Sequence, residues 1–326
     1  MEAIASKTVT QVQKQGSPAI EVKQLRKMFK DFVAVDSLTL SVERGEIYGL
    51  LGPNGSGKTT TINMISGLSK PTAGSITVFG QDIVHDPRSV RKLLGSIPQE
   101  TALYEELTAW QNMVFHAELY NVPRKEREER ITALLNLVEL FDRRNSLSGT
   151  FSGGMKRRLA FARALLHQPE LVYMDEPTLG VDVQSRHALW NYTRDLKKQG
   201  KTVLLTTNYL EEANELCDRI AIIDHGKLLA LDTPTRLKQT YGGTVIDLET
   251  DKPLSAATLE KLKHLPGVSQ FRQDGVALSM TVSGEQSVMA DAISLVTAEA
   301  RLTTITQREP SLNEVFIAIT GSQLRD

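Results

Sequence analysis

Apolar and polar positions alternate along the first fifty residues in the two-residue period of β-strands. The segments "IEVKQL" from Ile20 and "LTLSV" from Leu38 alternate in this way, and the turn "ERGE" then leads into the apolar run "IYGLL". The turn and its β-branched neighbours predict an antiparallel hairpin that feeds a buried strand. A helix over about 58–67, closed by Gly67, and short strands at "SITVFG" and "LGSIPQ" are predicted next.

The middle of the chain changes to longer periodic segments. Residues 102–150 form a helical stretch, in which "RKEREER" is typical of a solvated helix surface. From "FSGGM" at 151–155 onward, helices alternate with the strands "LVYMD" and "TVLLTT", and the hairpin "IAIID-HGK-LLALD" completes the series. This order predicts an α/β domain over 19–240, with a mostly parallel sheet, an antiparallel β subdomain and a helical subdomain at about 100–165.

A second unit is predicted after Tyr241-Gly242-Gly243. Residues 244–326 show the order β-α-β-β-α-β, followed by a last helix "SLNEVFIAIT", which is typical of a small ferredoxin-like α+β domain. The segment holds no glycine-rich loop, metal-ligand cluster or acid–base pair. We therefore expect a regulatory or dimerisation domain that can be deleted without unfolding the rest of the chain.

Composition excludes several classes of function. Lys+Arg 38 against Asp+Glu 39 gives a formal net charge of −1, without the basic excess of a nucleic-acid-binding protein. The single cysteine, Cys217, excludes an intramolecular disulfide. Residues 1–18 are polar and predict a disordered tail without a signal peptide. No run of about 18 apolar residues predicts a membrane-spanning helix, so we expect a cytosolic protein or one held at a membrane by a partner.

The clearest chemical motif is "GPNGSGKTT", which fits G-x-x-x-x-G-K-[ST] between a predicted strand and a predicted helix. Glycines let the backbone curl so that successive N–H groups point at the β- and γ-phosphates of a nucleotide. Lys58 adds a positive charge, Thr59 offers a hydroxyl to Mg²⁺, and Thr60 is placed to reach the α-phosphate. The predicted phosphate-binding residues are Gly52, Pro53, Asn54, Gly55, Ser56, Gly57, Lys58, Thr59 and Thr60.

The segment "LVYMDEP" at 171–177 supplies two carboxylates. Asp175 follows an apolar strand and emerges at its carboxyl end, where parallel sheets bind their ligands. This carboxylate can hold Mg²⁺ through water. Glu176, one residue further, is placed to polarise an attacking water, which predicts hydrolysis of the bound nucleotide.

The segment "FSGGM" is a second candidate anion site. Ser152, Gly153 and Gly154 open a basic helix, whose free N–H groups and dipole favour a negative charge. A plain helix N-cap at Ser152 is the simpler interpretation. Because a helix dipole contributes only about 0.3–1 kcal/mol to an exposed anion, the glycines would help only a phosphate brought very close.

Together these motifs resemble the ATP-binding-cassette (ABC) family over roughly residues 19–240. The resemblance implies that Phe29 in "RKMF" stacks on the adenine. It also implies that Gln99 in "SIPQE" touches Mg²⁺ and connects the nucleotide to a transmembrane partner. The segments "TTNYLEEA" and "PSLNEVF" narrow the resemblance to the daunorubicin-resistance type, which serves ABC-2 exporters and carries a small C-terminal domain.

The resemblance also gives the glycine pair a role. It identifies residues 152–154 as the family's signature motif, in which Phe151 and Met155 replace the usual Leu and Gln. In the family this motif caps the γ-phosphate of an ATP held by a second subunit, and Asp182 occupies the dimer-facing loop. The resemblance therefore implies a head-to-tail dimer with two ATP molecules, for which a homodimer is favoured over a heterodimer.

These inferences predict an ATP- and Mg²⁺-dependent ATPase that powers an ABC-2 exporter through a separate transmembrane permease subunit. It would lie at the cytoplasmic face of the membrane, with the permease docked on "ETALYEELTAWQNM" and the cargo chosen by the permease. The aromatic residues of this region, Tyr104, Trp110 and Phe115, would equally suit the core of the helical subdomain. One departure leaves an alternative open. Asn208 stands where the family has a catalytic His beside Glu176, which would suit a regulatory cassette with weak or no ATPase activity.

Overall fold

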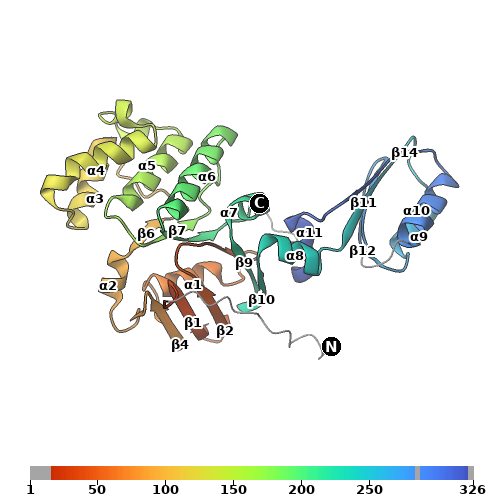
Figure 1. Cartoon of the computed structure of the whole chain (residues 1–326), viewed down its shortest axis with the longest axis horizontal. Coiled ribbons are helices and arrows are strands. Elements are labelled where there is room, and N and C mark those ends of the chain that lie inside the picture. The colour runs from red at the N-terminus through yellow and green to blue at the C-terminus, as the bar shows by residue number, and fades with distance from the viewer. Residues whose placement is uncertain (1–15, 283–286, 322–326) are drawn as a thin grey trace.

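A six-stranded sheet forms the centre of the larger domain in the computed structural model, which describes residues 16–282 and 287–321. The strand order is β10-β9-β3-β8-β7-β6, and every neighbouring pair except β10–β9 is parallel (Figure 1). Parallel strands are buried on both faces, which explains apolar runs such as "IYGLL". The strands are β3 (Ile47–Leu51), β6 (Leu94–Ile97), β7 (Leu171–Asp175), β8 (Thr202–Thr206), β9 (Arg219–Asp224) and β10 (Lys227–Asp232).

Different layers cover the two faces of this sheet. Alternate side chains of each strand point to opposite faces, so Tyr48 and Leu50 of β3 pack against α1 (Lys58–Ile65) and the N-terminal strands. Ile47 and Leu51 of the same strand pack on the other face, under the remaining helices of the cassette. The helix that follows the phosphate loop therefore lies on the opposite face from the helix that follows "FSGGM".

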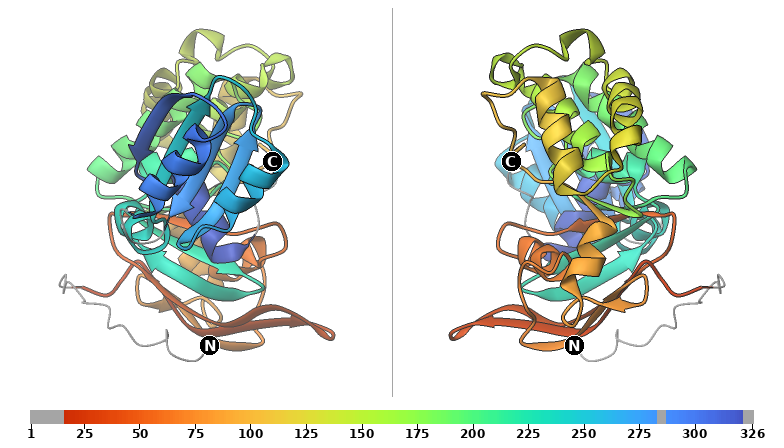
Figure 2. Two further views of the ribbon diagram at one scale, coloured as in Figure 1. Left: turned by 90° about the vertical axis from the view of Figure 1, so that its right-hand side faces the viewer. Right: turned by 90° about the vertical axis from the view of Figure 1, so that its left-hand side faces the viewer.

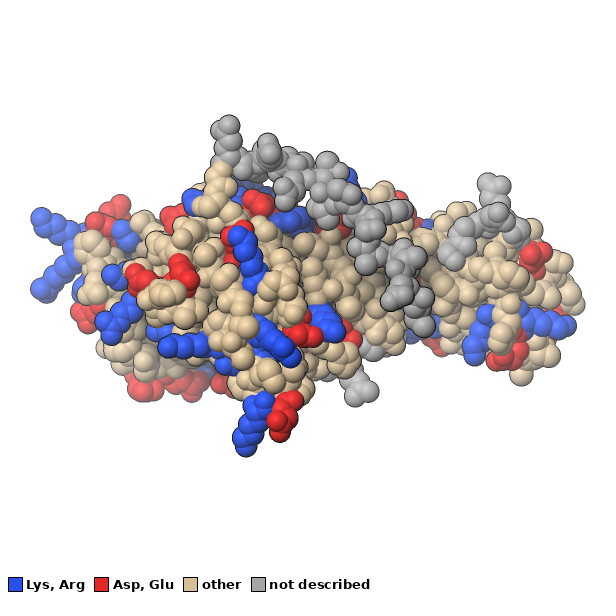
Figure 3. Space-filling model, turned by 90° about the horizontal axis from the view of Figure 1, so that it is seen from below, with Lys and Arg blue, Asp and Glu red and all other residues tan. Residues whose placement is uncertain are grey.

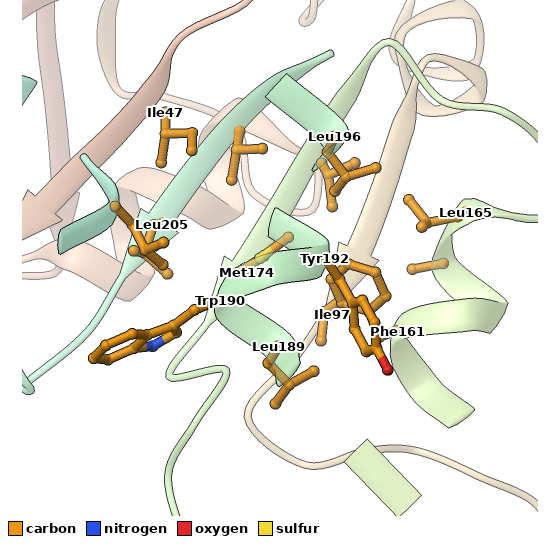
Figure 4. Packing of buried hydrophobic residues seen from close by; sticks show 14 of the residues in the cluster. Ile47, Ile97, Phe161, Leu165, Met174, Leu189, Trp190, Tyr192, Leu196 and Leu205 are labelled. Atoms are coloured by element: carbon orange, nitrogen blue, oxygen red, sulfur yellow. The ribbon is translucent and has the colours of Figure 1, made fainter. Parts of the chain in front are cut away.

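The second face carries the larger core. Its covering helices include α5 (Gly153–Leu165), α6 (Val183–Lys198) and α7 (Leu210–Leu216). Figure 4 shows Trp190 and Tyr192 of α6 packed over the strands, with Phe161 of α5 beside Tyr192. The ring centroids of Phe161 and Tyr192 are 5.6 Å apart. Burial of several aromatic rings at one junction stabilises the attachment of α5 and α6 to the sheet.

An antiparallel sheet in the order β2-β1-β4-β5 lies at the end of the cassette opposite the helical subdomain (Figure 2). Its strands are β1 (Ile20–Phe29), β2 (Phe32–Val42), β4 (Ala73–Val78) and β5 (Gln81–Asp82). The predicted hairpin turn at "ERGE" is wrong: β1 and β2 form the hairpin around Lys30, whose φ is 52°. The "ERGE" segment instead connects β2 to β3 in the other sheet. Of the predicted tail, residues 1–15 lie outside the described part of the chain.

The predicted helical stretch at 102–150 contains two helices, which pack against each other and against α5. The helices are α3 (Ala109–Leu119) and α4 (Arg124–Leu137), followed by short 3₁₀ turns at Phe141–Arg143 and Ser148–Thr150. A capping box between Thr108 and Gln111 fixes the start of α3. Two short helices were not predicted, α2 (Pro87–Lys92) and α8 (Pro234–Tyr241).

The C-terminal segment has the predicted β-α-β-β-α-β order, with its sheet in the order β12-β13-β11-β14. Every neighbouring pair is antiparallel, and α9 and α10 cover the face that points away from the cassette (Figure 1). This sheet order agrees with a ferredoxin-like arrangement. The elements are β11 (Thr244–Thr250), α9 (Ala256–Lys263), β12 (Val268–Asp274), β13 (Ala277–Val282), α10 (Ser287–Thr297), β14 (Leu302–Arg308) and α11 (Leu312–Thr320).

The last helix, α11, packs against the cassette and not against the small C-terminal sheet. Helix α11 packs against α8, α7 and β10, and its residues Leu312, Val315 and Phe316 are buried in the larger core of the cassette. The chain thus leaves the cassette near Gly242 and returns to it at Pro310: a Cβ built on Gly242 would lie 2.2 Å from Pro310 Cγ. The expectation that residues 244–326 can be deleted freely therefore needs correction, because their last helix completes the cassette.

Two deletions separate the small domain from α11. Excision of 244–309, which joins Gly243 to Pro310, should leave thermal unfolding of the cassette close to that of the full chain. A chain that ends at Gly243 should unfold at a markedly lower temperature, since Val315 and Phe316 are fully buried and each contributes roughly 1.5–3 kcal/mol. Equal unfolding temperatures for the two shortened chains would show that α11 adds nothing to the cassette.

Charged side chains of both signs are interspersed over the face drawn in Figure 3, as the net charge of −1 leads one to expect. Mixed charges of this kind give that face no extended positive field for a polyanion. Within 16–282 and 287–321, no helix combines the length and hydropathy needed to cross a membrane.

Candidate nucleotide-binding site

The phosphate loop connects the carboxyl end of β3 to the first turn of α1. The first intrahelical hydrogen bond of α1 runs from Thr61 N to Gly57 O (2.9 Å), so the N–H groups of residues 58–60 have no acceptor within the helix, while Ser56 N donates to Pro53 O (3.1 Å). Gly57 has φ 103°, and a Cβ there would lie 2.6 Å from Ala34 O. A Cβ on Gly52 would lie 2.2 Å from Ile223 O. Glycine is therefore required at both positions by close backbone contacts.

The Lys58 side chain folds back over the phosphate loop. Its Nζ donates to Gly52 O (2.6 Å) and Pro53 O (3.1 Å), which holds the ammonium at the centre of the loop. Burial lowers the pKa of Lys58, while the nearby Glu176 and Asp175 carboxylates oppose this effect. Ser56 Oγ is buried and has no partner among the described atoms. The N–H groups at the start of α1, beside a half-buried ammonium, fit the phosphates of a nucleotide.

The two carboxylates lie at the carboxyl edge of the central sheet, as predicted. Asp175 ends β7, and its Oδ1 accepts a hydrogen bond from Thr206 Oγ1 at the end of the neighbouring strand β8. The Tyr173 hydroxyl also lies within hydrogen-bonding reach of this carboxylate. Gln99 follows the end of β6, on the other side of β7, and its side chain is exposed. This edge of the sheet thus carries side-chain oxygen atoms from Asp175, Gln99 and the loop residue Thr59. Oxygen atoms are the ligands that Mg²⁺ prefers.

Glu176 is buried and held in an unusual backbone conformation. Its φ is 46°, and its N–H donates to Thr206 O (2.9 Å). The side-chain Oε2 accepts from Asn208 N (2.9 Å). Burial raises the pKa of Glu176, which the Asn208 hydrogen bond and the Lys58 charge partly offset. A buried carboxylate with a raised pKa and a fixed orientation is suited to accept a proton from water.

Asn208 reaches Glu176 through its main chain. The contact with Glu176 uses the backbone N–H, so any residue other than proline at this position would make it. The side-chain Oδ1 is buried and has no partner in the described part of the chain, so it can accept from a water beside Glu176. The replacement of the family's His thus leaves the orientation of the carboxylate intact.

The glycine motif starts α5 on the other face of the sheet. Ser152 Oγ accepts from Met155 N (3.3 Å), so Ser152 is the N-cap of α5. Gly153 is exposed and a Cβ there would come no closer than 4.0 Å to another atom, which is Gly180 O. Phe151, which departs from the family's Leu, is buried in the core. The cap therefore coexists with an open N-terminus at Gly153.

Asp182 lies next to this motif within the same chain. It caps α6, where its carboxylate accepts from Ser185 N (2.9 Å) and Ser185 Oγ (2.8 Å). These bonds to Ser185 lower the pKa of Asp182. A Cβ on Gly154 would lie 2.6 Å from Ser185 Oγ, so the two loops are in contact. Phe29 lies apart from both, at the exposed end of β1, with Lys27 Nζ 5.0 Å from its ring centroid.

Arg157 was not predicted. Its guanidinium is buried behind Glu176 and contacts only main-chain oxygens of the described residues. The available signal was helical spacing. Arg157 lies one turn before Phe161 and two turns before Ala164, on the apolar face of the helix, where an arginine is rarely buried without partners.

Comparison with known proteins supports this geometry. A solved structure described as an ATP binding subunit of an ABC transporter is similar with a TM-score of 0.64 and 34% identity, over 69% of this chain and 93% of that one. A dimeric ATP-binding cassette bound to ADP and Pi has a TM-score of 0.60 and 27% identity, over 66% and 98%. The family model "ABC transporter" matches residues 35–179.

Curated relatives match nearly the whole chain. The linearmycin resistance ATP-binding protein LnrL of Bacillus subtilis is 37% identical over 310 residues, 94% of this chain and 100% of the relative. The chain belongs to the ATP-binding subunits of ABC transporters. The daunorubicin/doxorubicin resistance ATP-binding protein DrrA of Streptomyces peucetius is 38% identical over 96% of this chain and 95% of the relative. The Nod factor export ATP-binding protein I of Rhizobium sp. is 36% identical over 94% and 98%.

The membership confirms the predicted P-loop ABC ATPase fold, the binding of ATP and the ATPase activity. A second family model, the C-terminal domain of ATP-binding proteins like DrrA1-3, matches residues 233–320. In this ABC ATPase that range runs from α8 to α11, the two helices that pack together at the edge of the cassette. The daunorubicin-resistance type is thereby confirmed as well.

Proposed function

We propose that the chain is the ATP-hydrolysing subunit of an ABC-2 type exporter and that it powers transport through a separate transmembrane permease. The observation that carries the proposal is the placement of the motifs. The phosphate loop, Asp175, Glu176 and Asn208 gather at one edge of the sheet, while the glycine motif opens a helix on the other face. Relatives named for resistance and export support the exporter role.

Two copies of the chain would form the working unit. The open N-terminus at Gly153 offers donors that its own phosphate loop does not use, which favours an ATP held by a second copy. We propose a head-to-tail homodimer with two ATP molecules between the subunits. ATP would contact the phosphate loop and Phe29 of one copy and residues 152–154 and Asp182 of the other.

The residues fit a magnesium ion beside the nucleotide. Thr59, Gln99 and Asp175 would hold Mg²⁺, directly or through water, which neutralises charge on the phosphate oxygens. The chain's own residues do the rest. Lys58 orients the phosphates, and Glu176 accepts a proton from the water that it orients with help from Asn208.

A regulatory cassette with weak ATPase activity is the second candidate, because Asn208 replaces the family's His. The hydrogen bond from the main-chain N–H of Asn208 to Glu176 favours the hydrolysing role, because this bond does not require a histidine side chain. Cargo is assigned to the permease. Relatives of 36–38% identity are named for three different kinds of compound, so identity to this subunit does not select a cargo.

The permease would hold the chain at the cytoplasmic face of the membrane and dock near α3. Tyr104 and Phe115 are both exposed there and form an edge-to-face pair with ring centroids 4.9 Å apart. Trp110, from the same predicted docking segment, packs against the core instead. Exposed aromatic pairs are characteristic of protein interfaces, and Gln99 lies at the start of this segment.

Substitution of Tyr104 and Phe115 by Ser tests the docking and the exporter role together. The double variant should keep the ATPase activity of the isolated chain but lose both its copurification with a membrane protein and any stimulation by that protein. The control Leu229→Ser, on β10, removes an equally exposed apolar side chain and should behave as the parent. A parent chain that hydrolyses ATP yet copurifies with no membrane protein would contradict the exporter role.

A further inference from the structure

The Arg157 guanidinium connects two loops of the active site. Its Nη1 donates to Pro98 O (2.6 Å) and Gln99 O (2.7 Å), in the loop after β6. Its Nε donates to Pro177 O (2.7 Å), in the loop after β7. Its Nη2 donates to the main-chain oxygens of the two carboxylate residues, Asp175 (2.9 Å) and Glu176. Five donors thus meet five carbonyl acceptors.

This arrangement is unusual for a buried cation. Arg157 is 3% exposed, and no ion pair to a carboxylate is found for it among the described residues. Burial lowers the pKa of Arg157, because the charged form loses its hydration. The five carbonyl dipoles and the nearby charges of Asp175, Glu212 and Glu176 oppose this effect without a direct ion pair. An apolar residue of similar volume would fill the space but could not hydrogen-bond to either loop.

Arg157 also links these two loops to helix α5, on which it lies. It lies one turn after Gly153, so the helix that starts with the glycine motif carries the guanidinium as a rigid extension. Two main-chain hydrogen bonds hold Glu176 at φ 46°. Its N–H donates to Thr206 O, and its main-chain carbonyl oxygen accepts from Arg157. A positive φ of this kind costs free energy and persists only where its surroundings fix it.

We propose that Arg157 is a positioning residue that couples the glycine-motif helix to Gln99 and to Glu176, so that a shift of α5 moves both loops together. The proposal rests on the proposed function in one respect, that closure of the dimer displaces α5. Lysine cannot replace arginine here. One ammonium donates three hydrogen bonds from a single point and cannot span acceptors on both loops.

Substitution of Arg157 by Lys, with Arg158→Lys as the matched control, tests the coupling. Arg158 is the next residue of α5, and it donates to Val138 O and Glu139 of the helical subdomain and lies within hydrogen-bonding reach of the Tyr192 hydroxyl. We expect R157K to bind ATP within twofold of the parent and to lower kcat at least tenfold, with little change in KM. R158K should match the parent in each measurement.

Hydrogen exchange distinguishes coupling from a general structural role. In R157K the amides of residues 99–103 and 175–179 should exchange faster together, while those of β3 and β8 keep their protection. Arg157→Gln serves for the same measurement if the lysine variant does not fold. Turnover of R157K within twofold of the parent, or faster exchange in one loop alone, would overturn the proposal. A parent without ATPase activity would refute the proposed function, and the exchange experiment would still decide the role of Arg157.

Discussion

Substitution of Glu176 by Gln should lower ATP turnover by about two to four orders of magnitude, the usual contribution of a general base. The side chain is 6% exposed, and its position is fixed by the Asn208 N–H, 2.9 Å from Oε2. Glutamine has nearly the same shape, and its oxygen can still accept that hydrogen bond, but it cannot take up a proton at neutral pH. Because the phosphate loop is untouched, ATP affinity should stay within a few-fold of the parent.

The dependence of turnover on pH provides a second check of this role. A general base must be ionised, and burial raises the pKa of Glu176 above the ordinary carboxyl value. Turnover of the parent should therefore fall on acidification at a pH above about 4.3, and the residual turnover of E176Q should lack this acid limb. The control Glu170→Gln removes an exposed carboxylate paired with Lys201 at 3.1 Å and should be neutral. Near-parental turnover in E176Q would refute the assignment of the base.

Substitution of Gly153 by Asp should abolish hydrolysis while leaving the single chain intact. The nearest atom to a Cβ at this position is Gly180 O at 4.0 Å, so the isolated subunit has room for the side chain. The new carboxylate would lie where the γ-phosphate of a partner's ATP is proposed to bind, and like charges repel strongly in a closed interface. ATP binding by the single chain should survive, and ATP-dependent dimerisation should be lost.

The neighbouring glycine gives a matched comparison. A Cβ on Gly154 would lie 2.6 Å from Ser185 Oγ and 3.2 Å from Ser185 Cβ. Gly154→Ala should therefore lower the unfolding temperature by disturbing the contact of α5 with α6, whereas Gly153→Asp should not. Loss of ATP binding by the isolated G153D chain would mean that the glycine motif acts on its own chain's nucleotide.

The chemical motifs could be predicted because each is local. The residues of the phosphate loop, and Asp175 with Glu176, are contiguous in sequence, and a strand followed by a loop determines which way they face. The elements of the C-terminal domain were predicted for a similar reason. Their apolar periodicity is clear, and the structure has the predicted β-α-β-β-α-β order.

Other features depend on partners distant in sequence. The apolar face of α11 has the same sequence pattern whether it packs on its own small sheet or, as found, on α7 and α8. The acceptors of Arg157 lie about 20 and 60 residues away, so their convergence could not be read from the helix. The sequence did not predict the turn at Lys30, because this turn lacks the glycine or asparagine that usually marks a positive φ.

Two short helices were missed although their signals were present. Both α2 and α8 begin with a capping residue followed by proline at the first helical position, Asp86-Pro87 and Thr233-Pro234. The Asp86 side chain accepts from Ser89 N, and that of Thr233 accepts from Arg236 N. Their brevity left no apolar periodicity to support the caps.

The mass of the E176Q chain in solution, measured by light scattering with and without ATP and Mg²⁺, tests the proposed two-copy site most directly. Without hydrolysis the closed dimer should accumulate, so the mass should double from 36.1 kDa when ATP and Mg²⁺ are added. The same chain carrying Gly153→Asp as well should bind ATP and remain at 36.1 kDa. An E176Q chain that is saturated with ATP yet remains a monomer would contradict the account.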